Sequence, residues 1–270
     1  MNWGCVITNA IIRWQNKPGS FSVELDKLTL STEQQGYKVP VMGRTASGKS
    51  TLLSLMAGLK WPEKGEVCWT FPEQDQVRWS SEQLPSPEER VALRQNRFGF
   101  AFQNHTLLPH LNVRDNLNYP LEFKGIVTKQ AYEKAENTLS EMLLPEERKN
   151  IKQLLQRFPN EISGGQYQRV ALAQAVVHEP NVLFADEPTG NLDLETRYQV
   201  MDVLNNWLTQ PDWNGKRLLI WVTHHHNDPQ LYGANNVLSV EHKDAHKASC
   251  HWENTTDYMA KLEGIRHGNL

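Results

Sequence analysis

Residues 43–50 of the chain read Gly43-Arg44-Thr45-Ala46-Ser47-Gly48-Lys49-Ser50. Glycine at both ends of a four-residue spacer lets the backbone curl, so that several N–H groups point at one anion. The lysine supplies a mobile positive charge for the β- and γ-phosphates of a nucleotide, and the serine hydroxyl is a ligand for Mg²⁺. The pattern predicts a phosphate-binding loop.

The segments on either side of the loop fit this chemistry. Residues 37–42 are predicted as a short strand that enters the loop, and residues 51–59 as a buried helix that leaves it. The N-terminus of that helix would favour the negative charge of a phosphate. A chance match of the bare pattern is the alternative, and this context disfavours it. Every loop residue, together with Thr51, is therefore a candidate nucleotide-binding residue.

Length and composition limit the class of protein. The 270 residues can form one large α/β domain with a small subdomain. A net charge of −3 gives no electrostatic basis for binding nucleic acid. Three unclustered cysteines, Cys5, Cys68 and Cys250, indicate a reducing compartment. We see no secretory signal and no apolar run of about 18 residues, and we expect that the chain does not cross a membrane by itself.

The rest of the chain divides into predicted strands, helices and loops. Strands are expected at residues 5–14, 21–30, 66–71, 97–103, 182–185, 217–223 and, as the last strand, 236–241. Helices are expected at residues 86–96, 113–119, 129–144, 145–155, 163–178 and 196–208. Residues 72–87 are predicted to be a polar loop, and the polar segment after residue 243 has only a weak helical pattern at residues 257–262.

Two further motifs follow the loop in the chain. An apolar strand ends in Asp186-Glu187, where the aspartate would hold Mg²⁺ through water and the glutamate would orient or deprotonate the attacking water. A helix opens with Ser163-Gly164-Gly165-Gln166, which offers a second anion site. Two such sites are useful if two subunits close on one nucleotide. The alternative for the second motif is an ordinary serine helix cap with a glycine turn.

These motifs, in this order, resemble those of the ATP-binding subunits of ABC transporters, and the resemblance runs from about residue 3 to residue 241. It implies an α/β fold, with a RecA-like P-loop NTPase core, an N-terminal antiparallel β subdomain and an inserted helical subdomain at about residues 104–178. The ATP-binding domain would then span residues 1–242, and residues 243–270 would form a polar C-terminal tail. The implied activity is ATP hydrolysis, with ATP and Mg²⁺ bound.

The resemblance also assigns roles to single residues. It makes residues 43–50 the Walker A loop, 183–186 the Walker B strand, 191–193 the D-loop, and 162–166 the signature motif, with Ile162 where the family usually has leucine. The implied catalytic residues are Glu187, His224 (a switch histidine), Lys49 and Gln103 (of the Q-loop), and the implied metal ligands are Ser50, Gln103 and Asp186. Outside the Walker A loop and Thr51, the implied ATP-binding residues are Trp14, Ser163, Gly164, Gly165, Gln166 and Asp193.

Three residues depart from the family pattern. Trp14 falls where an adenine-stacking tyrosine is usual, and it is either the stacking residue or a packing residue. Pro40 removes a hydrogen-bond donor from a central strand, which predicts a bulge or an unpaired site there. Gln174 replaces a usual arginine, so a charge contact would be lost. The histidines at 224–226, 242, 246 and 251 could suggest a metal, but their spacing favours no metal site.

A narrower resemblance, to the ATPases of lipoprotein release, macrolide efflux and cell division, rests on residues 100–104, 107–109, 113–116 and 185–193. It implies a second ATP-binding subunit, in a homodimer or a heterodimer, and a separate transmembrane permease at the cytoplasmic face of the inner membrane. The alternative is a soluble ABC-type ATPase that acts on a non-membrane partner. The apolar residues of 104–123, among them Leu107, Leu108, Leu111, Tyr119 and Leu121, are expected to dock a short helix of the membrane partner. The alternative, which is expected to hold for some of them, is that they form the core of the helical subdomain itself.

Overall fold

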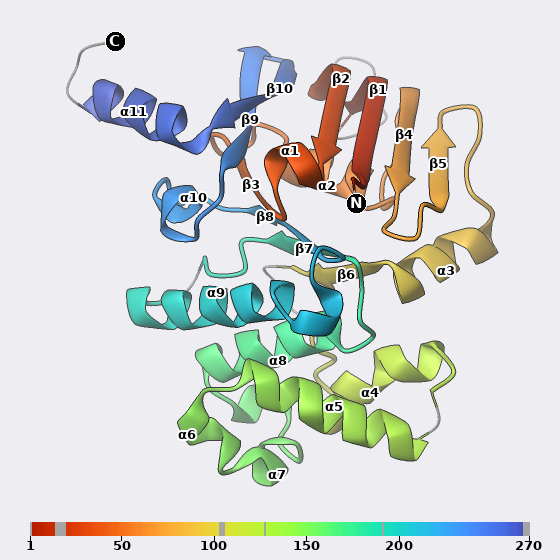
Figure 1. Ribbon diagram of the computed structural model, residues 1–270, viewed down its shortest axis with the longest axis vertical. Helices are drawn as coiled ribbons and strands as arrows, with labels where there is room; N and C mark the ends of the chain where they lie inside the picture. The colour runs from red at the N-terminus through yellow and green to blue at the C-terminus, as the bar shows by residue number, and fades with distance from the viewer. Residues whose placement is uncertain (1, 14–19, 103–105, 127, 191, 267–270) are drawn as a thin grey trace. The chain divides into compact units, whose positions relative to one another are not determined.

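The computed structural model describes residues 2–13, 20–102, 106–126, 128–190 and 192–266, and it forms two compact units (Figure 1). The first unit joins residues 1–90 to residues 218–270, and the second consists of residues 91–217. Three residues with predicted roles, Trp14, Gln103 and Asn191, lie outside the described residues.

The first unit is built on a mixed sheet with the strand order β5-β4-β1-β2-β10-β9-β3-β8. The strands are β1 (Gly4–Arg13), β2 (Ser22–Ser31), β3 (Lys38–Met42), β4 (Lys64–Thr70), β5 (Gln76–Ser80), β8 (Leu218–Val222), β9 (Asn236–Asp244) and β10 (Lys247–Asn254). Strands β1, β2, β4 and β5 pair antiparallel, which confirms the predicted antiparallel β subdomain at the N-terminal side. Strand β3 pairs in parallel with both β8 and β9.

Two strand predictions are wrong. The expected polar loop at residues 72–87 contains β5, whose Trp79 is buried against the sheet. The expected last strand is followed by β10, which pairs antiparallel with β9 and in parallel with β2. The described residues after 243 are therefore not a separate polar tail, because they supply a strand of the sheet and then a helix. Only every second residue of such strands faces the interior, so their overall composition is polar.

The helices of the first unit are α1 (Thr32–Gln35), α2 (Lys49–Met56), α10 (Asp228–Leu231) and α11 (Thr255–Arg266), and α3 (Pro87–Asn96) starts within it. Helix α2 contacts β1 and β8, and its residues Leu52, Leu55 and Met56 are buried, which confirms the predicted buried helix after the loop. Leu59 lies beyond the end of α2 and is exposed.

The proline in β3 does not cause a bulge. Pairing of β3 with β8 runs without a shift from Lys38 to Val41, and Pro40 lies opposite Trp221. On the other side, the pairs formed with β9 by the described residues involve only Val41 and Met42. Of the two predicted outcomes, the one observed is an unpaired site on the β9 side, where a missing N–H has no cost.

The second unit contains two parallel strands and a set of helices. Its elements are β6 (Phe98–Ala101), β7 (Val182–Asp186), α4 (Val113–Phe123), α5 (Thr128–Met142), α6 (Pro145–Arg148), α7 (Ile151–Leu154), η1 (Pro159–Glu161), α8 (Gly164–Val176), α9 (Leu194–Leu208) and η2 (Pro211–Trp213). Helix α4 continues through Pro120, and the helix predicted at residues 145–155 is split into α6 and α7. No helix in the described ranges has the length and apolar character that a bilayer span requires.

Candidate functional site

The phosphate-binding loop joins β3 to α2 in the first unit, and both of its glycines are needed. Gly43 has φ 151°, and a Cβ atom there would lie 2.3 Å from the carbonyl oxygen of Val240. Gly48 has φ 97°, and a Cβ atom would lie 2.5 Å from Val23 Cγ2. The backbone of the loop turns so tightly just before the N-terminus of α2 that only glycine fits at these two positions.

Lys49 and Ser47 lie inside this loop. Lys49 is only 5% exposed, and its Nζ donates to the carbonyl oxygens of Gly43 at 3.0 Å and Arg44 at 2.9 Å. Ser47 is fully buried, and its Oγ has no hydrogen-bond partner among the described residues. A buried hydroxyl without a partner, beside a lysine and a helix N-terminus, fits a bound phosphate chain.

The other loop residues differ in exposure. Arg44, Thr45, Ala46 and Ser50 are exposed, whereas Thr51 is buried in the first turn of α2. Ala46 has φ 62°, a left-handed conformation that costs about 1–3 kcal/mol for a residue other than glycine. The exposed side of the loop therefore presents backbone groups and the Ser50 hydroxyl, while Ser47, Lys49 and Thr51 hold it from within.

The loop that carries His224 follows β8, next to the strand that carries the phosphate-binding loop. Val41 pairs with Val222, so these two parallel strands end at the same edge of the sheet. After β8, the Thr223 hydroxyl donates to Asp228 Oδ2 at 2.6 Å, and the His225 N–H donates to Thr223 Oγ1 at 3.1 Å. His224 is exposed between these two buried anchors.

Asp186 and Glu187 lie at the C-terminal end of strand β7 in the second unit. Strand β7 is buried as far as Ala185, and Asp186 is half-buried at its end. Glu187 has φ 51°, and its carbonyl oxygen accepts from the Gly190 N–H at 3.1 Å, so the chain turns sharply at this glutamate. Ala185 lies opposite Ala101, two residues before Gln103, which is outside the described part of the chain.

The serine–glycine motif forms the N-terminus of α8. Gln166 N–H donates to Ser163 Oγ and Ser163 N–H donates to Gln166 Oε1, both at 3.2 Å, so Ser163 is a helix cap as the simpler alternative held. Gly165 is confined, since a Cβ atom there would lie 3.1 Å from Thr196 Cγ2. Gly164 has no atom within 4 Å of the position of a Cβ atom. Packing inside the described chain therefore does not require a glycine at residue 164.

A buried ion pair ties α8 to α6. Arg169 donates from Nε at 2.9 Å and from Nη2 at 2.6 Å to the two carboxylate oxygens of Glu147. The side chains are 4% and 12% exposed. Glu147 Oε2 also accepts from the Leu144 N–H and so caps α6. The pair fixes the first turns of α8, where Ser163 and Gly164 lie.

Replacing Arg169 with methionine should lower the free energy of unfolding by about 3–5 kcal/mol, because Glu147 would keep a mostly buried charge without its partner. Urea denaturation of the full chain measures the change. The control is the double variant Arg169→Met/Glu147→Gln, in which the glutamine keeps the cap on α6 but has no charge. We expect it to recover part of the loss. Equal stability of Arg169→Met and the parent chain would contradict a structural role of the pair.

Two other residues singled out in the sequence, Asp193 and Gln174, form defined hydrogen bonds. Asp193 is the helix cap of α9: its carboxylate accepts from the Thr196 N–H at 3.0 Å and from the Thr196 hydroxyl at 2.7 Å. These hydrogen bonds, led by the one from the Thr196 backbone, lower the pKa of Asp193. Gln174 donates from Nε2 to the backbone oxygen of Asn116 at 3.1 Å and to its Oδ1 at 3.2 Å. Where the family usually has an arginine, this chain has a neutral contact to a buried asparagine.

One of the histidines singled out in the sequence, His251, lies in a charged cluster on the strand pair β9–β10. Ligand atoms of Glu241, His251 and Glu253 all lie within 4.8 Å of one another. Lys261 Nζ lies 2.8 Å from Glu241 Oε1 and 3.4 Å from Glu253 Oε1, and His251 Nε2 lies 2.6 Å from the same Glu253 oxygen. Lys261 already forms ion pairs with both carboxylates, so we interpret the cluster as a salt-bridge network and assign it no metal.

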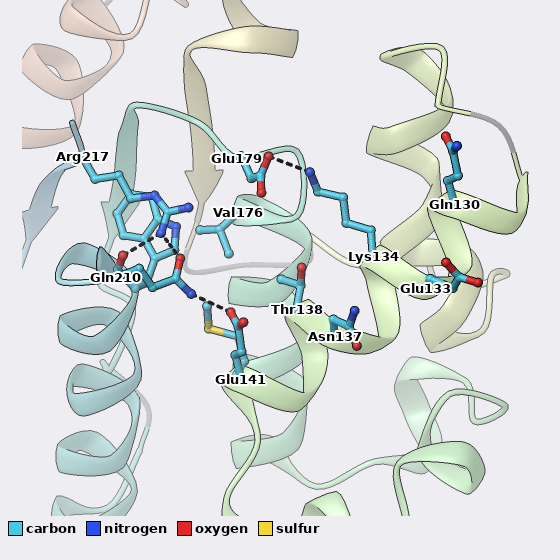
Figure 2. Close-up of a pocket in the computed structure, with 12 residues that line it drawn as sticks. Gln130, Glu133, Lys134, Asn137, Thr138, Glu141, Val176, Glu179, Gln210 and Arg217 are labelled. Carbon is cyan, nitrogen blue, oxygen red and sulfur yellow. Dashed lines mark hydrogen bonds and ion pairs between the residues drawn. The ribbon is translucent and has the colours of Figure 1, made fainter. Parts of the chain in front are cut away.

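A cavity of about 370 Å³ opens between α5, the end of α9 and the segment before β8, within the second unit (Figure 2). Arg217 donates from Nη1 to the Trp207 carbonyl oxygen at 2.7 Å and also to Gln210 Oε1, and it stacks on Trp207 and Trp213. Glu179 pairs with Lys134 at 2.7 Å, and Gln210 donates to Glu141 at 2.7 Å. None of the residues that line this cavity is a predicted site residue.

Comparisons with known proteins agree with the geometry. The protein-family model described as "ABC transporter" matches residues 25–190. The lipoprotein-releasing system ATP-binding protein LolD of Legionella pneumophila (strain Paris) is 38% identical over 69% of this chain and 75% of its own length. LolD of Aquifex aeolicus is 40% identical over 66% of this chain and 73% of its own length.

A solved structure is similar over almost the whole chain. The ATP-binding cassette MJ0796, as a dimer in a post-hydrolysis state bound to ADP and Pi, superposes with a TM-score of 0.71 and 26% identity, and the match covers 93% of this chain and 99% of that one. This likeness confirms the predicted α/β fold, with its P-loop ATPase core. The chain belongs to the ABC transporter family of ATP-binding proteins, whose activity is ATP hydrolysis.

Proposed function

We propose that this chain is the ATP-hydrolysing subunit of a membrane complex, in which two such subunits close on two ATP molecules and drive a separate transmembrane partner. The observation that supports it most is the loop in which Gly43 and Gly48 leave no room for a Cβ atom around the buried Lys49 and Ser47. This loop offers backbone N–H groups and one ammonium to a triphosphate, which is the recognition that an ATPase needs.

In this proposal, each residue around the triphosphate has its own role. Lys49 binds the β- and γ-phosphates, and Glu187 holds the attacking water and accepts its proton. His224 contacts the γ-phosphate from the neighbouring strand end. Mg²⁺ would be held by Ser50, Gln103 and Asp186, and when bound it neutralises charge that develops on the phosphates. Trp14 stacks on adenine in this proposal, although it lies outside the described residues.

The second subunit completes each site. Ser163 and Gly164 begin α8, where the backbone N–H groups of a first helical turn have no partner within the helix. The empty space beside Gly164 leaves room for a phosphate held by the other chain. LolD of Legionella pneumophila belongs to a lipoprotein-releasing system, and MJ0796 is a dimer. The likeness to these proteins supports the proposal that this chain forms a dimer and acts with a permease at the cytoplasmic face of the inner membrane.

The surface proposed for the permease is on α4, and only some of the expected docking residues, Tyr119 among them, are exposed there. Leu107 and Leu121 are buried at 2% and 0%, so they belong to the interior of the second unit. Tyr119 and Phe123 are 43% and 57% exposed, and their rings meet edge to face at 4.8 Å between centroids. A pair of exposed aromatic rings on one helix face suits the apolar side of a partner helix.

Replacing Phe123 with glutamate should abolish co-purification with the permease and partner-dependent ATP hydrolysis, while ATP binding by the isolated chain persists. Leu84→Glu is the matched control, because Leu84 is also exposed, at 45%, and lies in the first unit. Co-purification and ATPase assays of the two variants measure the difference. A normal complex with Phe123→Glu would place the docking surface elsewhere.

The proposal as a whole is tested by sedimentation with membranes. We expect the chain to sediment with membranes only when its permease is co-expressed. A chain that hydrolyses ATP but never sediments with membranes under any co-expression would favour the alternative, an ABC-type ATPase with a non-membrane partner.

A further inference from the structure

The C-terminal helix α11 packs on the strand pair β9–β10 of the first unit and reaches Met42, at the end of the strand that leads into the phosphate-binding loop. Tyr258 is 8% exposed and lies in a buried cluster with Met42 and Val237, against which Met259 and Leu262 also pack. Met42 is the residue immediately before Gly43, the first residue of the phosphate-binding loop. Helix α11 also contacts β9, β10 and the short α10 that follows the loop of His224 (Figure 1).

One hydrogen bond links α11 to that loop. His226 Nδ1 lies 3.2 Å from the Tyr258 hydroxyl, and His226 is two residues after His224. The loop is thus held from two sides, by the Thr223–Asp228 hydrogen bond inside and by Tyr258 from α11. A phenol can donate or accept, so it can bond either tautomer of the imidazole. Burial raises the pKa of Tyr258 to about 12.

The helix is anchored at its start, at Thr255, and again about two turns later, at Lys261. At its start, the Thr255 N–H donates to the Asn235 carbonyl oxygen at 3.0 Å, and the Thr255 hydroxyl donates to the Ala234 carbonyl oxygen at 2.7 Å. Further along, Lys261 bridges Glu241 and Glu253 on the strand pair β9–β10. Tyr258 lies between these two anchors, so its hydroxyl is presented to His226 from a fixed position.

We propose that Tyr258 is a positioning residue for ATP hydrolysis, which acts through His226 on the loop that carries His224. The inference rests on the proposed contact of His224 with the γ-phosphate. The segment after residue 243 is then part of the hydrolytic apparatus, because the hydroxyl of α11 limits where the imidazole of His224 can lie. An error of about 1 Å in the position of a catalytic group is enough to lower a rate by up to about 100-fold.

The test compares steady-state ATP hydrolysis by the full chain and three variants. Tyr258→Phe keeps the ring in its buried cluster and removes only the hydroxyl. We expect kcat to fall about tenfold while KM for ATP stays within about twofold, since the phosphate-binding loop is unchanged. His226→Ala should show the same fall, and the double variant should be no worse than either, because one hydrogen bond is lost in all three.

Two controls separate this effect from a general loss of structure. Tyr37→Phe removes the same hydroxyl from an exposed tyrosine of the same unit and should leave kcat unchanged. His226→Asn, which keeps a hydrogen-bonding group near the position of Nδ1, should restore part of the lost kcat. If Tyr258→Phe folds poorly, His226→Ala tests the same bond from an exposed loop residue without altering the buried cluster.

His224→Ala, measured in parallel, distinguishes the two ways of failing. If His224→Ala is inactive but Tyr258→Phe and His226→Ala keep the parent kcat, the positioning role is overturned and the proposed function stands. If His224→Ala keeps the parent kcat, the proposed role of His224 fails and the inference fails with it. Additive losses in the double variant, or a raised KM with unchanged kcat, would likewise overturn the positioning role.

Discussion

Replacing Glu187 with glutamine is expected to lower the rate of ATP hydrolysis by about 100-fold or more while ATP still binds. The amide keeps the size and a hydrogen-bonding oxygen of the carboxylate, but it cannot accept the proton of the attacking water. The contacts of Lys49 and the phosphate-binding loop with the triphosphate do not involve this side chain. The structure also shows how the backbone that carries this carboxylate is held. Glu187 has a left-handed backbone conformation, φ 51°, in a turn that is closed by the Gly190 N–H.

Single-turnover hydrolysis and equilibrium ATP binding, measured on the same preparation, test this prediction. Glu195→Gln is the matched control, because it makes the same chemical change at an exposed position in the first turn of α9. We expect it to behave like the parent chain. Near-normal turnover by Glu187→Gln would remove Glu187 from the role of general base, and a loss of ATP binding would indicate that the turn itself had changed.

The sequence predicted the parts of the fold whose signals are local. The phosphate-binding loop, β3 and α2 were identified because glycine spacing and an apolar helical face are adjacent in the chain. Strand β8 was found as a run of five apolar residues, all of which are buried. The antiparallel pair β1–β2 was also predicted, since two strand patterns adjacent in the chain are separated by the turn signal Lys17-Pro18-Gly19 in the sequence.

The elements that were missed depend on partners distant in the chain. Strand β10 pairs with β2, more than 200 residues earlier, and no local pattern specifies such a pairing. Strand β5 has one fully buried large side chain, Trp79, among polar neighbours, so its composition indicated a loop. Leu107 was a docking candidate because it lies in an apolar segment with few charges, yet it fills the interior of the second unit, as the alternative interpretation of that segment allowed.

The same distinction between local signals and distant contacts applies to the site residues. Lys49, Asp186 and Ser163 belong to short motifs and were identified directly from the sequence. The groups that hold these motifs in place were not, because each is a tertiary contact between segments well apart in the chain: Glu147 with Arg169, Asn116 with Gln174, and Tyr258 with His226. A buried glutamate or asparagine has no sequence signature of its own. Only the fold shows which motif it supports.

The second prediction with a large effect concerns the proposed composite site. Lys49→Ala should remove ATP hydrolysis, because the ammonium that binds the β- and γ-phosphates is lost. Ser163→Arg should also remove it, because a long side chain would occupy the place beside Gly164 where the phosphate of the other subunit is expected. Each variant alone forms a dimer in which both sites carry one defect.

A mixture of the two variants should regain activity. In a mixed dimer, one site combines the Lys49→Ala loop with the Ser163→Arg helix, and the other combines two intact halves. Random pairing would give about half mixed dimers with one intact site of two, so roughly a quarter of the parent rate if the sites act independently. ATP hydrolysis is measured as a function of the mixing ratio, and light scattering in the Glu187→Gln background reports ATP-dependent dimers. If Lys49 and Ser163 of one chain served the same nucleotide, no mixing ratio would exceed the average of the two variants, and that result would contradict the composite site.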